Sequence, residues 1–345
     1  MIKSLVKIIV AVLLFLFVGT GIHAQTEATK ILFIGNSYTH MNNMPSMFDK
    51  FAQAEGRNVL VQKSTHSGYC FREHAEREDM YEDINSQKWD YVVLQGYSRE
   101  FSHTPEYIDS ATVPYLRQIT DSIYTNNPCT NVLLYMTWGY EDGFPEREEI
   151  DTYEEMADSI ERGYSYASEL FRIPVVPVGM VWKQVKENTE IDLYAKDRAH
   201  PSMSGSFLIA NTFFNAIFHS VALDEDIKVI EPETAAEIKQ YTSQVIEELR
   251  AKYHLDGNQF KTIDYTTEKG KYLLEYTSMF PMANVIEWDF GDGESSIIPD
   301  GVHKYRKHGT YTVKLRIVDG CGERTFEQRI EYKKYKKQRK RCKKD

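Results

Sequence analysis

The segment KILFIGNS, residues 30–37, decides the fold of the first part of this chain. Its four consecutive apolar residues, 31–34, are too few for a helix and are typical of a strand buried on both faces of a parallel sheet. Comparable apolar runs follow at 91–94, 132–136 and 175–178, and a further strand is expected at 58–62. Helix-like stretches separate these runs, at 44–55, 106–124 and 152–171. This alternation predicts an α/β domain around a parallel sheet.

Two further helices are expected before the pattern changes near residue 258. One begins near Ser202, and the other runs from about Pro232 to Tyr253 with apolar residues on one face. Beyond them, residues 260–332 alternate apolar and polar side chains between Gly-Asp turn signals, which predicts a small β-sandwich. We therefore expect two folded domains, at 28–257 and 260–332, in agreement with the length of 345 residues.

Residues 1–24 are typical of a secretory signal peptide. Lys3 and Lys7 precede an apolar core at 8–18, and small residues lead to Ala24, after which we expect cleavage. An uncleaved anchor helix is the alternative, but the apolar core is shorter than the roughly 20 residues of a membrane span. The pattern predicts a bacterial protein that is secreted or periplasmic.

Charge is distributed unevenly along the chain. The net charge is −10, yet residues 333–345 hold nine Lys or Arg against a single Asp. The acidic body argues against nucleic acid as a partner, because neutralising phosphates needs a basic face. We expect residues 333–345 to be a solvated, disordered tail, or alternatively a means of attachment to an anionic cell envelope.

Two short clusters hold the candidate catalytic residues. Ser37 directly follows the first expected strand, at the sheet edge where α/β proteins bind ligands. Asp197 and His200 lie three residues apart, after the fourth apolar run. A serine nucleophile needs a base to take its proton and a carboxylate to hold that base in the right tautomer. The alternative for the serine is a structural one, in which its hydroxyl caps the next helix or closes a turn.

Together, Gly35-Asn36-Ser37 and Asp197-x-x-His200-Pro201 resemble the motifs of the SGNH/GDSL-type serine hydrolases. The resemblance covers about residues 30–255. It implies a flavodoxin-like, three-layer α/β fold and hydrolysis of esters, with Ser37 as nucleophile, His200 as general base and Asp197 as its orienting partner. Asn36 stands where the family has aspartate, which marks a divergent branch.

The resemblance also implies an oxyanion hole, which holds the negative oxygen that develops during the reaction. Its expected donors are the backbone N–H groups of Ser37 and of Gly68, within the Ser67-Gly68-Tyr69 block. The third donor of the family is an asparagine, but this chain reads Gln95-Gly96-Tyr97-Ser98 at that point. We expect the Gln95 carboxamide to replace it. The alternative is that Gln95 only braces the loop.

Nothing in the sequence predicts a metal or another cofactor. Four histidines near the expected active edge lack helical His-x-x-x-His spacing and cysteine partners, which disfavours a zinc site; they are His40, His66, His74 and His103. No glycine-rich phosphate loop is present. Four cysteines, too few for a disulfide scaffold, permit three complete pairings that the sequence leaves open; they are Cys70, Cys129, Cys321 and Cys342.

The second domain carries its own motif. Residues 288–293 read WDFGDG, followed by His303-Lys304-Tyr305 and by GTYTV at 309–313. This pattern resembles the PKD repeat, which implies an immunoglobulin-like β-sandwich that serves as a spacer or binds polysaccharide or protein. Asp289 and Asp292 could ligate calcium, but turn-stabilising roles are favoured.

These observations predict an exported esterase that removes acetyl or similar O-acyl groups from a polysaccharide. The carbohydrate part of this prediction rests on the association of export with a PKD-like module. A lipase or thioesterase is one alternative, and it would need a continuous apolar groove beside Ser37. A catalytically degenerate, glycan-binding surface protein is the other alternative.

Overall fold

The computed structural model describes residues 27–220, 229–255, 260–266, 271–280 and 283–334. The expected signal peptide and residues 335–345 of the expected basic tail lie outside these ranges. Among the described residues, none of the helices combines the length and the apolar character needed to cross a bilayer.

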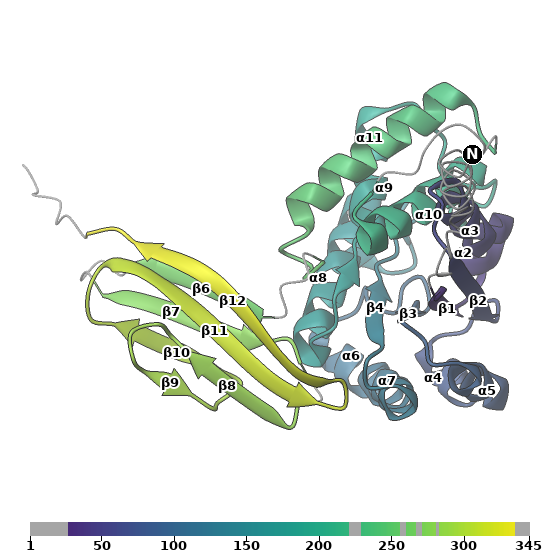
Figure 1. Cartoon of the computed structure of the whole chain (residues 1–345). Coiled ribbons are helices and arrows are strands. Elements are labelled where there is room, and N and C mark those ends of the chain that lie inside the picture. The colour runs from purple at the N-terminus through teal and green to yellow at the C-terminus, as the bar shows by residue number, and fades with distance from the viewer. Residues whose placement is uncertain (1–26, 221–228, 256–259, 267–270, 281–282, 335–345) are drawn as a thin grey trace, which may run out of the picture.

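Five parallel strands form the sheet of the N-terminal domain, in the spatial order β2-β1-β3-β4-β5 (Figure 1). They are β1 (Thr29–Gly35), β2 (Val59–Thr65), β3 (Tyr91–Leu94), β4 (Asn131–Tyr135) and β5 (Val175–Val176). This order is that of flavodoxin-like folds, so the predicted fold class of this domain is confirmed.

Helices cover both faces of the sheet and give the domain three layers. On one face α3 (Met44–Ala54) and α9 (Val178–Asn188) pack against α10 (Met203–Phe218), and α11 (Pro232–Leu249) packs outside them. On the other face, α7 (Val113–Asn126) packs against α4, α5 and α6, and α6 also contacts α8. The bounds of these four are α4 (Phe71–Ala75), α5 (Glu78–Ser86), α6 (Pro105–Ala111) and α8 (Tyr153–Phe171). Single turns complete the set: α2 (Ser37–His40), η1 (Met41–Asn43) and η2 (Glu148–Ile150).

The apolar run of β1 lies at the centre of the core. Residues 31–34 are fully buried, and the Phe33 ring meets the edges of Phe48 in α3 and Phe213 in α10, with centroids 5.8 and 5.3 Å apart. Burial of these side chains from both faces explains why the run has no alternating polar residues.

Two local differences from the expected elements have simple causes. The helix expected at 106–124 is broken at Thr112, because Pro114 has no backbone N–H to continue the first helix and lies instead in the first turn of the second. The strand expected at 175–178 ends at Val176, and Pro177 caps α9 instead.

The C-terminal domain is a β-sandwich of two antiparallel sheets, ordered β10-β7-β6 and β12-β11-β8-β9. Its strands are β6 (Phe260–Thr266), β7 (Tyr272–Ser278), β8 (Val285–Asp289), β9 (Ser295–Ser296), β10 (Asp300–Tyr305), β11 (Gly309–Asp319) and β12 (Gly322–Tyr332). Val313, Leu315 and Ile317 are fully buried against Trp288 and Phe290. The predicted immunoglobulin-like sandwich is therefore confirmed.

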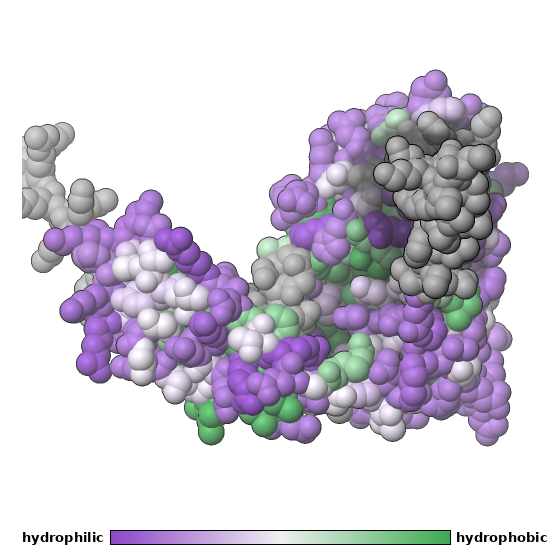
Figure 2. Space-filling model, viewed as in Figure 1, coloured by the Kyte–Doolittle hydropathy of each residue, from purple (hydrophilic) through white to green (hydrophobic). Residues whose placement is uncertain are grey.

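The sandwich contacts the α/β domain through the tip of the β11–β12 hairpin (Figure 1). A disulfide joins Cys321 at this tip to Cys129, which precedes β4. Arg172, which precedes β5, donates to the Ser278 carbonyl at 2.7 Å and pairs with Asp300. These α/β-domain residues lie at the amino edge of the sheet, opposite the edge that bears Ser37. In the space-filling view the two domains meet along one side and diverge on the other (Figure 2).

The structure thus selects one cysteine pair from those that the sequence left open. Cys70 has no disulfide partner among the described residues, and Cys342 lies outside them.

Candidate active site

Ser37 lies at the carboxyl edge of the sheet, at the start of the single-turn helix α2. Asn36 caps this turn, because its side-chain oxygen accepts the Tyr38 N–H at 3.0 Å. The preceding residue must be small, since a Cβ on Gly35 would lie 2.6 Å from the Gln95 side-chain oxygen. This tight turn leaves the serine half-exposed while both of its neighbours are buried.

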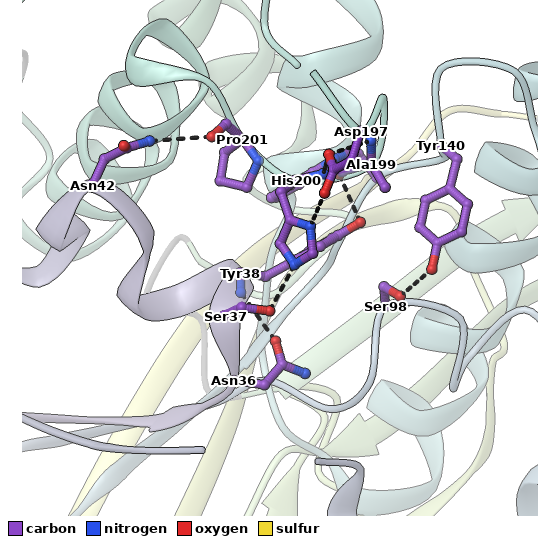
Figure 3. A network of polar contacts seen from close by, with 11 residues as sticks. Asn36, Ser37, Tyr38, Asn42, Ser98, Tyr140, Asp197, Ala199, His200 and Pro201 are labelled. Carbon is purple, nitrogen blue, oxygen red and sulfur yellow. Dashed lines mark hydrogen bonds and ion pairs between the residues drawn. The ribbon is translucent and has the colours of Figure 1, made fainter. Parts of the chain in front are cut away.

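The structure brings Ser37, His200 and Asp197 together from positions about 160 residues apart in the sequence (Figure 3). Ser37 Oγ lies 2.8 Å from His200 Nε2, and His200 Nδ1 lies 2.5 Å from Asp197 Oδ2. Because the carboxylate accepts a hydrogen bond from Nδ1, Nε2 is left to accept the serine proton. The serine hydroxyl is therefore not committed to capping a helix or closing a turn.

A short loop holds the acid and the base in this position. It is closed at its base by a bridge between Tyr194 and Pro201. Asp197 Oδ1 accepts the backbone N–H groups of Ala199 and His200, at 3.2 and 3.0 Å. Burial raises the pKa of the Asp197 carboxyl, but hydrogen bonds from the His200 backbone and ring and the Ala199 backbone outweigh it, so the pKa is lowered overall. The carboxylate therefore stays ionised beside the imidazole at neutral pH.

A column of buried aromatic rings supports the same loop. The Tyr38 ring stacks on Trp138 at 4.4 Å between centroids, and Trp138 stacks on Trp182 at 4.0 Å. The Tyr38 hydroxyl and the Trp138 indole N–H both donate to the Ala199 carbonyl, at 2.7 and 3.1 Å. Since Ala199 directly precedes His200, the column fixes the height of the imidazole above Ser37.

Asn42 provides a second tether between the segment that contains Ser37 and the histidine loop. It occupies the left-handed region, with φ of 51°, a conformation that asparagine tolerates better than most residues. Its side-chain amide donates to the carbonyls of Pro201 and Ser202, at 3.1 and 2.9 Å, and lies 2.9 Å from Ser206 Oγ. The two chain segments that form the site are thus joined directly, outside the sheet.

Two of the expected oxyanion donors lie at the same edge of the sheet. The Ser37 N–H belongs to the first residue of α2, where a helix leaves N–H groups without partners in the helix itself. Gly68 is exposed in the loop after β2 and has a φ of +78°, which favours glycine. His66, two residues earlier, donates its N–H to the Gly35 carbonyl at 3.0 Å, so this loop runs beside the serine turn.

Gln95 differs from our expectation of an oxyanion donor. Its side chain is fully buried, and its oxygen accepts the Asn36 N–H at 2.9 Å and the Thr39 hydroxyl at 2.8 Å. Its amide nitrogen donates to the Gly96 carbonyl. With both ends engaged beneath the turn, the carboxamide braces the loop, which is the alternative role that the sequence left open.

Asn36 explains why an amide can replace the aspartate of the resembling family. Its side-chain nitrogen donates to the carbonyls of Tyr69 and Gly96, each at 3.1 Å. These carbonyls belong to the loops after β2 and β3, so one buried side chain joins the loops that follow three strands. A carboxylate at this position could not donate either hydrogen bond.

A buried carboxylate, Glu100, was not predicted from the sequence. It accepts the N–H groups of Tyr97, at 2.8 Å, and Phe71, at 3.2 Å. Burial raises its pKa to about 7, against the lowering effect of these hydrogen bonds. Glu100 thereby ties the loop after β3 to the start of α4, and Gly96 leaves the space that it fills.

The four histidines named above do not converge on one point. Within the described residues, the structure contains no group of three or more His, Cys, Asp or Glu side chains placed to hold a metal ion. His74 is buried, and burial together with Arg77 lowers its pKa to about 4. His103 contacts Arg147 away from the serine.

One family model and several solved structures match parts of this chain. The PKD domain family model matches residues 282–333. Among solved structures, a DUF4886 family protein from Bacteroides uniformis superposes with a TM-score of 0.56 and 18% identity, over 64% of this chain and 95% of that one. A putative SGNH hydrolase from Slackia heliotrinireducens gives a TM-score of 0.44 at 22% identity, over 55% of this chain and 98% of that one.

Among curated proteins, Collagenase ColA of Clostridium perfringens is 32% identical over 113 residues, which are 32% of this chain and 8% of the collagenase. Collagenase ColA of Bacillus cereus is 32% identical over 121 residues, 34% of this chain and 10% of that protein. The chain thus spans about a tenth of the length of these relatives. The match to the DUF4886 family protein supports the predicted α/β fold, and the family model supports the predicted resemblance of the C-terminal domain to PKD domains.

Proposed function

We propose that this protein is a serine ester hydrolase in which Ser37 is the nucleophile, His200 the general base and Asp197 the residue that orients the base. One observation carries the proposal. The serine oxygen, the imidazole and the carboxylate form one continuous line of hydrogen bonds, of 2.8 and 2.5 Å. Nucleophile, base and orienting acid within hydrogen-bond reach of one another are the arrangement that activates a serine.

The reaction follows from this arrangement. Ser37 Oγ attacks the ester carbonyl as His200 Nε2 takes the serine proton, and Asp197 stabilises the imidazolium that forms. The tetrahedral intermediate collapses when His200 returns that proton to the leaving alcohol oxygen, which leaves an acyl group on Ser37. Water then attacks the acyl-enzyme with the same imidazole as base, and the free acid departs.

The negative oxygen of each intermediate is assigned to the N–H groups of Ser37 and Gly68. Both lie at the carboxyl edge of the sheet, and both belong to tight turns. The Gln95 carboxamide is hydrogen-bonded within the loop beneath the turn. It therefore does not replace the asparagine that is the third oxyanion donor of the resembling family.

We further propose that the substrate is an O-acylated polysaccharide carrying acetyl or similarly small acyl groups. Ser37 and His200 are half-exposed, so a polymer can reach them without entering a deep tunnel. Polar side chains frame the site, including the hydrogen-bonded pair Ser98 and Tyr140, at 2.7 Å (Figure 3). A small acyl group suits these surroundings better than a long alkyl chain does, and the PKD domain supports a polymeric substrate.

Export remains our proposal for the location of the protein, through cleavage of residues 1–24. The Cys129–Cys321 disulfide supports it, because structural disulfides persist in oxidising compartments such as the periplasm or the cell exterior. Attachment to an anionic envelope through residues 333–345 is a further part of this proposal.

The decisive experiment compares Ser37→Ala with the unmodified chain on p-nitrophenyl acetate and on acetylated xylan. We expect kcat to fall by at least about 10³-fold, because the substitution removes the proposed nucleophile. Ser110→Ala is the matched control, since Ser110 is an exposed serine on α6 whose hydroxyl donates to the Tyr107 carbonyl. Unchanged hydrolysis by Ser37→Ala would refute the assignment.

A graded series of aryl esters tests the size of the acyl group. We expect the rate to fall as the chain lengthens beyond acetyl. A rise toward longer chains would favour the lipase or thioesterase alternative. Inactivity of the unmodified chain on every ester, together with glycan binding, would favour the degenerate binding protein.

A further inference from the structure

A cavity of about 380 Å³ lies between the loop after β3 and the side of α8, apart from the serine. Its polar lining comes from three segments of the chain: Ser102, His103 and Thr104 in that loop, Arg147 and Glu149 between β4 and α8, and Ser159, Arg162 and Tyr166 on α8. The three α8 residues are spaced three and four apart and so share one face of the helix. Two arginines therefore face the same hollow in a chain whose net charge is negative.

Arg147 is held in the cavity wall mainly by neutral groups. Its guanidinium lies 2.9 Å from His103 Nδ1 and contacts the carbonyl and hydroxyl of Ser102. The pKa of His103 is lowered to about 4 by burial and by the charges of Arg147 and Arg99, so the imidazole is neutral at pH 7. The carboxylate paired with Arg147 is Glu149, 3.7 Å away and 78% exposed. The positive charge of Arg147 is thus only weakly compensated.

Arg162 lines the cavity and is exposed, and it has no hydrogen-bond or ion-pair partner among the residues that the structure describes. A planar guanidinium presents five N–H donors in a fixed fork that matches carboxylate and phosphate oxygens. Because Arg147 lines the same cavity, two guanidinium groups are available to an anion that enters it.

The cavity is close enough to Ser37 to act on the same substrate. Ser98, which lies beside the candidate catalytic residues (Figure 3), is five residues before His103 in the same loop. Even a fully extended chain of this length spans at most about 18 Å. Ser98 and the cavity residues His103 and Arg147 belong to the loops that follow β3 and β4, at the same edge of the sheet. A bound glycan chain could thus contact both at once.

We propose that this cavity binds an anionic substituent of the glycan whose ester is cleaved at Ser37. The substituent is the carboxylate of an acidic sugar or a sulfate or phosphate ester, all of which offer the oxygens that arginine forks recognise. This inference rests on the proposed esterase function and adds to it a preference for acidic over neutral polysaccharides.

The kinetic test uses Arg162→Gln in the full chain, since this arginine supports no other described residue. We expect KM for acetylated oligogalacturonate to rise about tenfold with little change in kcat, as expected for lost binding outside the reacting centre. KM for acetylated xylo-oligosaccharide and the rate on p-nitrophenyl acetate stay unchanged. Arg329→Gln is the matched control, because Arg329 is exposed on β12 of the PKD domain.

A binding test separates this inference from the esterase proposal. Calorimetry on the full-length Ser37→Ala chain compares unacetylated oligogalacturonate, a sulfated oligosaccharide and neutral xylohexaose. Tighter binding of either anionic chain, lost in the Arg162→Gln double variant, supports the inference, and the tighter of the two identifies the anion. Equal binding of charged and neutral chains, or anionic binding that survives Arg162→Gln, overturns it whatever the outcome of the ester assays.

Discussion

Replacing Asn36 by aspartate, the residue of the resembling family, tests how this chain holds its nucleophile turn. Asn36 is 2% exposed, and its side-chain nitrogen donates to the carbonyls of Tyr69 and Gly96. Asn36→Asp removes both donors and places a carboxylate oxygen against the two carbonyl oxygens. Losing a partner of a buried polar group costs roughly 1–3 kcal/mol. Two such losses predict a fall of about 2–6 kcal/mol in the free energy of unfolding.

The assay is urea denaturation of Asn36→Asp beside Asn85→Asp. The control loses a comparable hydrogen bond, from its side chain to the Tyr81 carbonyl at 2.8 Å, but on an exposed helix surface, so we expect less than about 1 kcal/mol. The decrease in the free energy of unfolding caused by Asn36→Asp should become smaller toward low pH. A buried carboxyl has a raised pKa when folded, so it destabilises the folded state once the pH rises above the unfolded value. Equal destabilisation of the two variants would show that the buried hydrogen bonds of Asn36 do not stabilise the turn.

Two further predictions concern residues away from the serine. Burial raises the pKa of Glu100 in the folded state to about 7, so the folded state binds more protons than the unfolded state between pH 4.5 and 7. The free energy of unfolding of the unmodified chain should therefore fall by up to about 3 kcal/mol as the pH rises through this range. Urea titrations of Glu100→Gln should show most of this fall removed, and an unchanged dependence on pH would contradict the prediction. Cys129→Ser removes the disulfide and should lower the free energy of unfolding by about 2–5 kcal/mol. We expect no change in kcat/KM on p-nitrophenyl acetate, because the disulfide lies at the edge of the sheet opposite Ser37. A large loss of kcat/KM would contradict this and show that the two edges are coupled.

The fold was predictable because its signals are local. The apolar runs of β1, β3 and β4 carry no alternation, and the residues of β11 alternate strictly, so the sequence distinguishes buried parallel strands from sandwich strands. Ser37, Asp197 and His200 were also accessible to sequence reasoning, since each belongs to a short motif next to an expected element.

The residues that support the site were harder to find, because their roles depend on contacts between distant loops. Gln95 lies at a strand end, where a donor to the substrate and a brace for the turn look alike in sequence. Only the positions of Asn36 and Thr39 show that the carboxamide is already committed. Trp138 and Arg162 likewise carry no motif, and only tertiary packing shows that one supports the histidine loop and the other faces a cavity.

The most direct test of the account is to trap the acyl-enzyme. The full chain is mixed with p-nitrophenyl acetate, quenched in acid within milliseconds and analysed by peptide mass spectrometry. We expect a mass increase of one acetyl group on the peptide that contains Ser37 in the unmodified chain, and no such increase on that peptide in His200→Ala. Acetylation of a different residue during turnover, or acetylation of Ser37 at the same rate in His200→Ala, would contradict the claim that His200 activates Ser37 as the nucleophile.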